Sequence, residues 1–294
     1  MPSYVRLPEG DPPYPVMLDF LDARFPNVGL EVWRERLKSG KISTERGEIV
    51  TEATAYRPSL LLRYFREVAE EPPVPFDAQI LFQNEHLLVA CKPHFLPVTP
   101  AGAFVNHCLL YHLTQTTGLR ELAPLHRIDR ETAGLVMFSV NPQTRGIYHQ
   151  LFKAGDIRKI YEAVAALPPD AERTEWLIES RIEVGEPWFR VKNAAGKINA
   201  ASKITLLARR GDYGYFRLEP LTGKQHQLRA HLLLIGSHIL HDRCYPELQP
   251  KQPDDPNRPL QLLAKSLQFI DPISGEAMAF ESSRRLLWPI NGAS

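Results

Sequence analysis

Four strand-like segments follow one another between residues 157 and 221, and only short connections join them. They are rich in β-branched and other apolar residues and span 157–167, 176–184, 200–208 and 214–221. Consecutive strands with short connections pair side by side, whereas parallel pairing needs a long crossover that is usually a helix. The sequence therefore predicts a mixed α+β fold with a mostly antiparallel sheet, not a doubly wound parallel one.

Weaker signals complete the expected elements. Short apolar runs at 79–82, 86–91 and 134–140 indicate further strands. Helices are predicted over 105–114, 142–154 and 225–235. Asn141 suits a helix N-cap and Pro142 the first helical position, while Gly155 suits the end of that helix.

A proline-rich stretch at residues 70–76, EEPPVPF, disfavours a helix and suits an extended linker. Upstream, apolar residues recur at helical spacing in 17–25 and 32–37, and Gly40 suits a helix end. We therefore expect a small, mainly helical N-terminal appendage over residues 1–71 and a larger domain over residues 72–294.

Cysteine usage and the absence of a targeting pattern predict the compartment. Cys91, Cys108 and Cys244 are odd in number and widely spaced, which argues against a disulfide framework or a cysteine-rich zinc site. The first residues lack the pattern of a signal peptide, and no stretch approaches the roughly 18 apolar residues of a membrane span. We expect a soluble cytoplasmic protein in a reducing environment.

The nine residues 126–134, HRIDRETAG, surround one aspartate with two arginines and a histidine. A carboxylate among cations stays ionised, and Arg can hold one of its oxygens while the other is free to react with a sugar carbon or another electrophile. A surface loop held by an Asp–Arg salt bridge would show the same pattern. The net charge of the whole chain is only +1 and does not decide between these readings.

The same nine residues closely resemble the H-R-L-D-x-x-T-S-G signature of the RluA-type pseudouridine synthases. Further blocks resemble the family in the same order, and together they cover about residues 76–285. They are 80–98 with Lys92-Pro93, 159–161 (KIY), 222–232 (TGKQHQLRAHL) and 239–245 (ILHDRCY). The resemblance implies a pseudouridine synthase catalytic domain over 72–294 that isomerises a uridine of structured ribosomal or transfer RNA by base flipping.

The resemblance also implies roles for single residues. Asp129 is the expected catalytic carboxylate, Arg229 the residue that keeps it ionised and oriented, and Tyr161 a stacking and proton-transfer group. Arg229 is expected to share a helix face with Gln225. The candidate substrate contacts are His126, Arg127, Arg130, Lys159, Lys224 and Leu228.

Within this set, Arg127 is expected to enter the space that the flipped uridine leaves, and Leu228 to pack beneath the base. Arg130, Lys159 and Lys224 are candidates for phosphate contacts. The isomerisation involves no redox change, so no cofactor is expected. We also expect no metal, because His226 and His231 lack the spacing of a helical zinc pair.

The chain departs from the family pattern at several positions, each of which can alter RNA choice or loop shape. Lys224 stands where the family usually has Arg, Ala133 where it has Ser and His241 where it has Gly. His94-Phe95 follows K-P where the family commonly has a Gly. None of these departures removes Asp129.

Two other functions stay open at this point. One is a non-catalytic RNA-binding protein on the same scaffold, against which the presence of Asp129, Tyr161 and Arg229 speaks. The other is a hydrolase of glycosidic bonds, which needs a second carboxylate such as Glu131. Also open are the target RNA, the way in which Asp129 acts, and whether the appendage is a degenerate RNA-binding domain or only packs. We expect a monomer.

Overall fold

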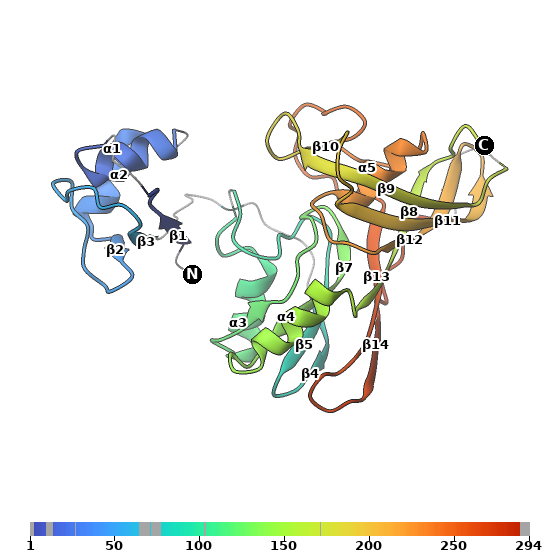
Figure 1. Ribbon diagram of the computed structural model, residues 1–294, viewed down its shortest axis with the longest axis horizontal. Coiled ribbons are helices and arrows are strands. Elements are labelled where there is room, and N and C mark those ends of the chain that lie inside the picture. The colour runs from blue at the N-terminus through green and yellow to red at the C-terminus, as the bar shows by residue number, and fades with distance from the viewer. Residues whose placement is uncertain are drawn as a thin grey trace. The chain divides into compact units, whose positions relative to one another are not determined.

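The computed structural model describes residues 3–9, 14–26, 28–64, 71, 78–102, 104–170 and 172–288. The chain forms two compact units, Met1–Glu71 and Pro72–Ser294 (Figure 1). Of the proline-rich stretch 70–76, only Glu71 lies within the described ranges, so its expected role as a linker stays a prediction. Within these ranges, no helix has the length and apolar character needed to cross a bilayer.

The N-terminal unit combines two helices with a small antiparallel sheet. Helices α1 (Met17–Arg24) and α2 (Leu30–Lys38) lie where the sequence predicts them. The sheet has the order β1-β3-β2 and consists of β1 (Ser3–Arg6), β2 (Ile42–Thr44) and β3 (Leu61–Tyr64). These strands were not predicted, because three or four residues are too few to show an alternating pattern in the sequence.

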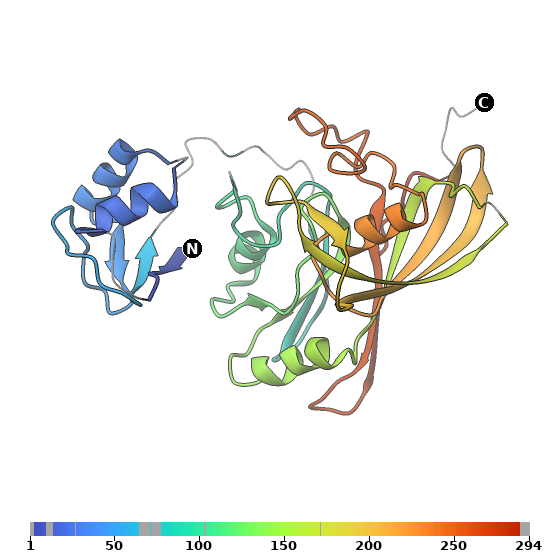
Figure 2. The ribbon, with the colours of Figure 1, turned by 45° about the horizontal axis from the view of Figure 1, so that its top comes forward.

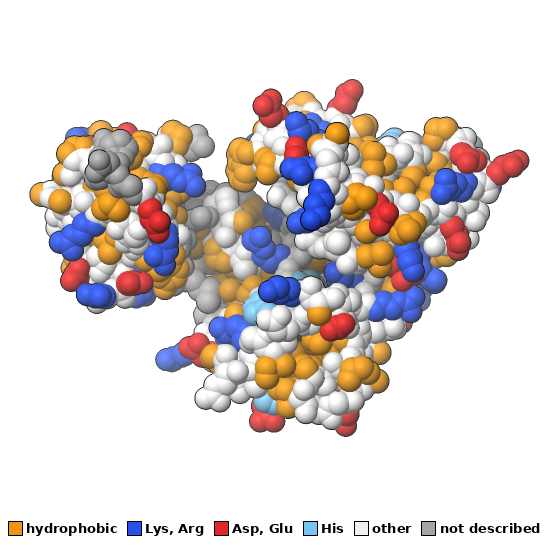
Figure 3. Space-filling view, viewed as in Figure 1, with side chains coloured by type: hydrophobic (Ala, Val, Ile, Leu, Met, Phe, Trp, Pro, Cys, Tyr) orange, Lys and Arg blue, Asp and Glu red, His pale blue; other side chains and the backbone are white. Residues whose placement is uncertain are grey.

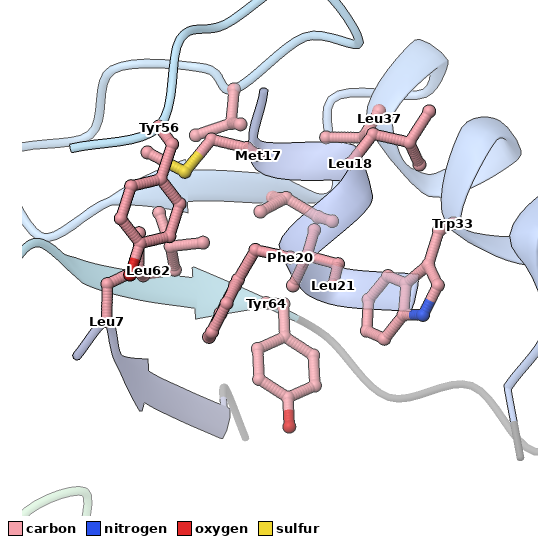
Figure 4. Close-up of a cluster of buried hydrophobic side chains, with 12 residues drawn as sticks. Leu7, Met17, Leu18, Phe20, Leu21, Trp33, Leu37, Tyr56, Leu62 and Tyr64 are labelled. Carbon is pink, nitrogen blue, oxygen red and sulfur yellow. The ribbon is translucent and has the colours of Figure 1, made fainter. Parts of the chain in front are cut away.

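Side chains from both helices and from the sheet meet in a core of their own (Figure 4). Phe20 and Leu21 of α1, Trp33 of α2, and Leu62 and Tyr64 of β3 are all buried. The rings of Trp33 and Tyr64 meet edge to face, with centroids 5.9 Å apart. This unit therefore has a hydrophobic core independent of the second unit.

The second unit is built on one sheet of 11 strands, in the order β10-β9-β11-β12-β8-β13-β7-β5-β4, with β14 beside β13 and β6 beside β7. The strands are β4 (Gln79–Gln83), β5 (Leu87–Lys92), β6 (Ala123–Pro124), β7 (Ala133–Ser139), β8 (Arg158–Ala166), β9 (Glu175–Val184), β10 (Val191–Ala194), β11 (Ala200–Arg210), β12 (Tyr213–Pro220), β13 (Leu262–Ile270) and β14 (Ala277–Glu281). Of their pairings, only that of β13 with β7 is parallel. The predicted α+β class with a mostly antiparallel sheet is confirmed.

In the described part of this unit, three helices cover the sheet (Figures 1 and 2). They are α3 (Leu109–Thr117), α4 (Arg145–Ala154) and α5 (Gln227–Leu234). Alternate residues of β5 face opposite sides, so that Leu88 packs in the cluster under α3 and Val89 in the cluster under α4. Helix α5 contributes Leu228 and Leu232 to a cluster over β8, β11 and β12. Helix α5 packs against β9, β10, β11 and β12, and it shares this cluster with Tyr161 of the neighbouring strand β8.

The predicted helix starts were wrong by a few residues. Helix α3 begins at Leu109, where the Leu109 amide bonds to the carbonyl of Pro97 at 2.8 Å. Helix α4 begins at Arg145, because residues 142–144 form a turn in which the Asn141 side chain accepts the amide of Gln143 at 2.9 Å. Local capping signals located these helices but not their first residues.

Gly134, the last residue of the HRIDRETAG segment, allows β7 and β13 to come together. Its φ is +113°, and an added Cβ would overlap the backbone of Ala264, its partner in the parallel pairing. Only glycine combines this conformation with so close an approach. The loop that carries Asp129 is therefore joined to the middle of the sheet at a position that tolerates no side chain.

Two departures from the family pattern lie at left-handed backbone positions. Phe95 has φ 64° and His241 has φ 63°. Such a conformation costs about 1–3 kcal/mol for a residue other than glycine. His241 Nδ1 lies 3.1 Å from the carbonyl oxygen of Pro259, and the buried Phe95 ring faces the guanidinium of Arg130 at 5.8 Å. Both segments thus keep a glycine-type conformation while the new side chains make contacts of their own.

Candidate active site

Asp129 lies in the loop between β6 and β7. Its carbonyl oxygen accepts the amide of Thr132 at 3.1 Å, which closes a turn, and β7 begins one residue later at Ala133. The Asp129 side chain is 23% exposed. The carboxylate is therefore fixed at its backbone but still open to a reactant.

Arg229 of α5 joins Asp129 to a second carboxylate. Its Nη1 donates to Asp129 Oδ2 at 3.2 Å, while its Nε and Nη2 donate to the two oxygens of Asp242 at 2.8 and 2.6 Å. The side chains of Arg229 and Asp242 are each 1% exposed. Burial acts to lower the pKa of Arg229, but the hydrogen bonds and charge of Asp242, together with Asp129, outweigh it and raise that pKa. Arg229 is thus a permanent cation beside Asp129.

Asp242 has its remaining hydrogen-bonding capacity filled by the backbone. Its Oδ1 also accepts the amides of Cys244 and Tyr245 at 2.8 and 3.1 Å. A carboxylate with this many donors holds its position firmly. Asp242 therefore anchors Arg229, and only Nη1 of Arg229 is directed at Asp129.

The second oxygen of Asp129 faces His226. The distance from Asp129 Oδ1 to His226 Nε2 is 3.8 Å, too long for a hydrogen bond. Nδ1 of His226 lies 3.1 Å from the hydroxyl of Tyr245. Burial lowers the pKa of His226, and the charge of Asp129 opposes this shift only in part. A neutral imidazole beside Oδ1 leaves that oxygen available for chemistry.

Tyr161 of β8 is partly buried and packs on the cluster that includes Leu228 of α5. Burial and then the negative charge of Asp129 raise the pKa of Tyr161. The phenol is therefore protonated at neutral pH and is electrostatically coupled to Asp129. Tyr161 of β8, Arg229 of α5 and Asp129 of the β6–β7 loop thus come from three separate segments that the fold brings together.

Lys92, the lysine of the K-P block, is a buried cation. Its side chain is fully buried at the end of β5, and Nζ donates to the carbonyl oxygens of Pro93 and Arg130 at 2.9 and 3.1 Å. Burial lowers its pKa to about 7, an effect that the charges of Glu131 and Asp129 oppose. The hydrogen bond from Lys92 to the carbonyl oxygen of Arg130 thus ties the end of β5 to the loop that carries Asp129.

The guanidinium of Arg130 is occupied by partners within the protein. It donates to both oxygens of Asp254 at 2.7 and 3.0 Å and forms an ion pair with Glu131 at 3.0 Å. It also lies over the rings of Phe95 and Phe104, 5.8 and 5.4 Å from their centroids. A phosphate contact by Arg130 would require an exchange of partners, and the expected contact stays a prediction.

His126 lies inside the loop. Its Nε2 accepts the amide of Met137 at 3.1 Å, and its ring packs on Phe152 with centroids 4.8 Å apart. Burial, followed by the charge of Lys159, lowers its pKa to about 3, so the ring is neutral. These contacts suit a structural residue, and the substrate contact expected for His126 stays a prediction.

Lys159 is partly buried on β8, and burial lowers its pKa. Arg127 and Lys224 are exposed, and within the described ranges no other residue pairs with either side chain. Figure 3 shows Lys and Arg side chains around a recess on this face of the second unit. Arg127 and Lys224 are thus free to bind an anion such as a phosphate, whereas Arg130 is not.

One argument from the sequence was wrong. Gln225 precedes α5, because His226 adopts a left-handed conformation (φ 49°) and the helix starts at Gln227. Gln225 therefore shares no helix face with Arg229, and its side chain instead donates to the carbonyl of Phe189 at 3.0 Å. Asp242 was also missed as a site residue, although it stands in the ILHDRCY block of the family.

No group of three or more His, Cys, Asp or Glu side chains in the described ranges could hold a metal ion. The imidazole of His231 is buried, with Nε2 3.1 Å from the hydroxyl oxygen of Ser180.

Comparisons with known proteins identify the family. The family model described as RNA pseudouridylate synthase matches residues 86–234, which include Asp129, Tyr161 and Arg229. An uncharacterized RNA pseudouridine synthase of Synechocystis is 31% identical over 231 residues, covering 78% of this chain and 79% of that protein. The dual-specificity RNA pseudouridine synthase RluA of Haemophilus influenzae is 28% identical over 72% of this chain and 95% of its own.

A solved structure shows the same fold. Human RNA pseudouridylate synthase domain containing 1 superposes with a TM-score of 0.58 at 19% identity, over 73% of this chain and 86% of that chain. Some matched relatives are longer, and this chain spans 55%, 60% and 32% of three of them. By its matched family model and its relatives, the chain belongs to the RluA-type RNA pseudouridine synthases, enzymes that isomerise uridine to pseudouridine in RNA.

Proposed function

We propose that this protein isomerises a specific uridine of structured ribosomal or transfer RNA to pseudouridine, with Asp129 as the catalytic carboxylate. One observation carries the proposal: Arg229, fixed by Asp242, holds Oδ2 of Asp129, while Oδ1 faces the neutral imidazole of His226 at 3.8 Å, beyond hydrogen-bonding distance. A surface salt bridge would not need a fully buried partner anchored by a second buried carboxylate. The geometry therefore supports a reactive carboxylate.

The reaction breaks the glycosidic bond, turns the uracil and joins its carbon 5 to the ribose. Electrons balance without an oxidant or reductant, so the reaction requires no cofactor. Asp129 attacks the anomeric carbon or the uracil ring, or removes a proton from the sugar; each route uses a carboxylate that is ionised and oriented. Arg229 supplies both conditions through its charge and its single directed hydrogen bond.

Tyr161 serves the last step, in which ring carbon 5 loses its proton. In the resting enzyme the charge of Asp129 helps to keep the phenol protonated. A covalent bond between Asp129 and the substrate would neutralise that charge and lower the pKa of Tyr161. Loss of that charge would ease proton transfer by Tyr161, while burial, the larger cause, still raises its pKa.

The target uridine has to leave its stack to reach Asp129, at a cost of a few kcal/mol. Arg127, exposed and two residues from Asp129, is proposed to fill the vacated space, and Leu228 to pack beneath the base. Lys159 and Lys224, with Arg130 after an exchange of partners, are proposed phosphate contacts that add affinity without reading sequence.

Three further proposals concern the oligomeric state, the location and the N-terminal unit of the protein. We infer that it acts as a monomer in the cytoplasm, where its RNA substrates are found. We also propose that the N-terminal unit assists RNA binding, with simple packing as the alternative outcome. Removal of residues 1–71 followed by a measurement of RNA affinity tests the last point, because the second unit has separate cores of its own.

The decisive experiment measures tritium release from RNA labelled at carbon 5 of uridine, isolated from cells that lack the protein. The wild-type protein should release tritium and Asp129→Asn should not, although both should bind the RNA. Equal release by the two proteins would remove Asp129 from the mechanism. Binding without release by the wild type would favour a non-catalytic RNA-binding protein, and free uracil would favour a hydrolase.

Position-by-position mapping of pseudouridine in cells with and without the protein would identify the target.

A further inference from the structure

We propose that the tip of the β9–β10 hairpin is a base-stacking element, on which an unpaired base next to the target uridine lies. The inference rests on the proposed function and specifies how the same RNA is held. Trp188 is 80% exposed, more than any other large apolar side chain in the described ranges. Its ring meets that of Phe189 edge to face, with centroids 5.9 Å apart. Two adjacent exposed aromatic rings form a surface that water solvates poorly and that a flat base can cover.

The hairpin tip is held in a defined shape. The amide of Gly185 donates to the carbonyl of Arg190 at 2.9 Å. The amide of Arg190 donates to the carbonyl of Pro187 at 2.8 Å. Gln225, the residue before His226, donates to the carbonyl of Phe189 at 3.0 Å. The aromatic pair is therefore carried on a backbone that is fixed on both sides, which lowers the entropic cost of binding.

Contacts also connect the hairpin to the residues around Asp129. The guanidinium of Arg190 lies over the ring of Tyr245 at 5.0 Å, and that of Arg229 lies over the same ring at 5.2 Å. The hydroxyl of Tyr245 accepts the amide of Val191 at 2.8 Å. Tyr245 thus stands between the hairpin and the Arg229–Asp129 pair, and the stacking surface has a fixed position relative to the catalytic carboxylate.

The views in Figures 1 and 2 agree on the setting of this hairpin. It projects at the β10 end of the sheet beside the loop of residues 241–259. The loop and the hairpin are joined by a hydrogen bond of 2.8 Å from Arg190 to the carbonyl of Pro246. The hairpin is therefore an outer part of the same surface to which α5 contributes its N-terminal end.

The charges near the tip suit an RNA strand. Lys192 and Lys197 are exposed on and after β10, and Lys224 is exposed next to Gln225. Glu186 is the exposed acid at the tip, while Glu183 is paired with Arg181 at 2.6 Å. The phosphates of a strand can follow the lysines while a base covers the aromatic pair.

An unpaired base is the occupant that this chemistry favours. Flipping a uridine leaves its neighbours without a stacking partner, and every base offers a face to an aromatic ring. Stacking of this kind does not depend on sequence, so Trp188 and Phe189 would contribute affinity and register rather than recognition of a particular base.

The test compares wild type, Trp188→Ala and Trp188→Phe as full-length proteins. The affinity for a labelled single-stranded oligouridylate is measured by fluorescence anisotropy. Trp188→Ala should raise its Kd by about 5- to 100-fold, and Trp188→Phe should restore most of the loss because it keeps an aromatic face. The affinity for a blunt RNA duplex should not change, since its bases are already stacked.

A matched control is Leu177→Ala, which removes an exposed apolar side chain from the other end of β9. It should behave as wild type. In the tritium-release assay Trp188→Ala should raise the apparent KM and leave kcat unchanged. An unchanged Kd for oligouridylate, an equal loss with the duplex, or a fall in kcat at constant KM would each overturn the stacking role.

The same data separate this inference from the proposed function. Normal tritium release by wild type together with unchanged behaviour of Trp188→Ala would refute the stacking role alone. Absence of release by wild type, with oligouridylate binding that still depends on Trp188, would refute the isomerase and retain the stacking surface.

Discussion

Arg229 lies 100 residues after Asp129 in the chain, yet its Nη1 donates a hydrogen bond of 3.2 Å to Oδ2 of Asp129. The other side of the same guanidinium is held by Asp242, and the side chains of Arg229 and Asp242 are almost completely buried. The orientation of the proposed catalytic carboxylate therefore depends on Asp242, which acts on Asp129 through Arg229. This dependence can be tested by changing Asp242.

Asp242→Ala should destabilise the protein and reduce its activity together. Removal of Asp242 leaves the buried Arg229 with Asp129, bound through one hydrogen bond of 3.2 Å, in place of two carboxylates, at a cost of about 3–5 kcal/mol in the free energy of unfolding. Glu219→Ala breaks the exposed pair with Arg158 and should cost at most about 1 kcal/mol. Urea unfolding of both variants, with tritium release below the transition, checks the prediction. Similar losses in the two variants would argue against a structural role for the buried pair.

Tyr161→Phe should fold and bind RNA as wild type does, because the ring and its packing on the Leu228 cluster are kept. Its kcat for tritium release should fall by about 100-fold or more, since general acid–base groups contribute at least that much. Single-turnover kinetics would measure the effect. A kcat close to that of wild type would restrict Tyr161 to stacking against the base.

Lys92 should make stability depend on pH. Its folded pKa of about 7 lies below the value of about 10.4 in an unfolded chain, so the unfolded chain binds more protons between these two pH values. The free energy of unfolding should therefore rise with pH across this window, by an amount on the order of a few kcal/mol, and Lys92 should add no pH dependence below it. Lys92→Met should lose this rise, whereas Lys203→Met, at an exposed site on β11, should keep it. Parallel pH curves for Lys92→Met and wild type would contradict the assignment.

Asp254→Asn should release Arg130 and strengthen RNA binding. The variant removes the carboxylate that binds both Nη atoms of Arg130, so a phosphate has to displace Glu131 but no longer Asp254 to reach the guanidinium. The slope of log K against log salt concentration should become steeper by about 0.7–0.9, the value for one added phosphate contact. Asp255→Asn removes the same charge from the same loop and serves as the control. Equal changes in the two variants would indicate a general charge effect and no contact by Arg130.

Gly134→Ala should be strongly destabilising, by about 3 kcal/mol or more. The substitution combines a positive φ with overlap against the backbone of Ala264, and neither can be relieved by a side-chain movement. Gly146→Ala is the matched control, because this glycine of α4 has open space around it and an alanine there favours the helix by up to about 1 kcal/mol. Thermal unfolding of both variants measures the contrast. A tolerated Gly134→Ala would mean that β7 and β13 can separate without loss of the fold.

Several features could be predicted from the sequence because they are local. Strand patterns, the stop at Gly155 and the HRIDRETAG segment each occupy a few consecutive residues. The helices α1 and α2 were visible for the same reason, but β1, β2 and β3 were too short to show a pattern. The start of α5 was misjudged because His226 leaves the helical conformation to meet Tyr245, a contact 19 residues away in the chain.

The sequence by itself determined which side chains could do the chemistry: Asp129, Tyr161 and Arg229 lie in blocks whose order and spacing match the family. Only the tertiary structure decided their state. In the folded protein Arg229 lies between Asp129 and Asp242. Lys92 is buried against the Asp129 loop, and Arg130 forms an ion pair with Asp254. The physical reason is that the energy of a charge depends on its distance to other charges and on its exposure to water. Neither quantity is encoded in any short segment of the chain.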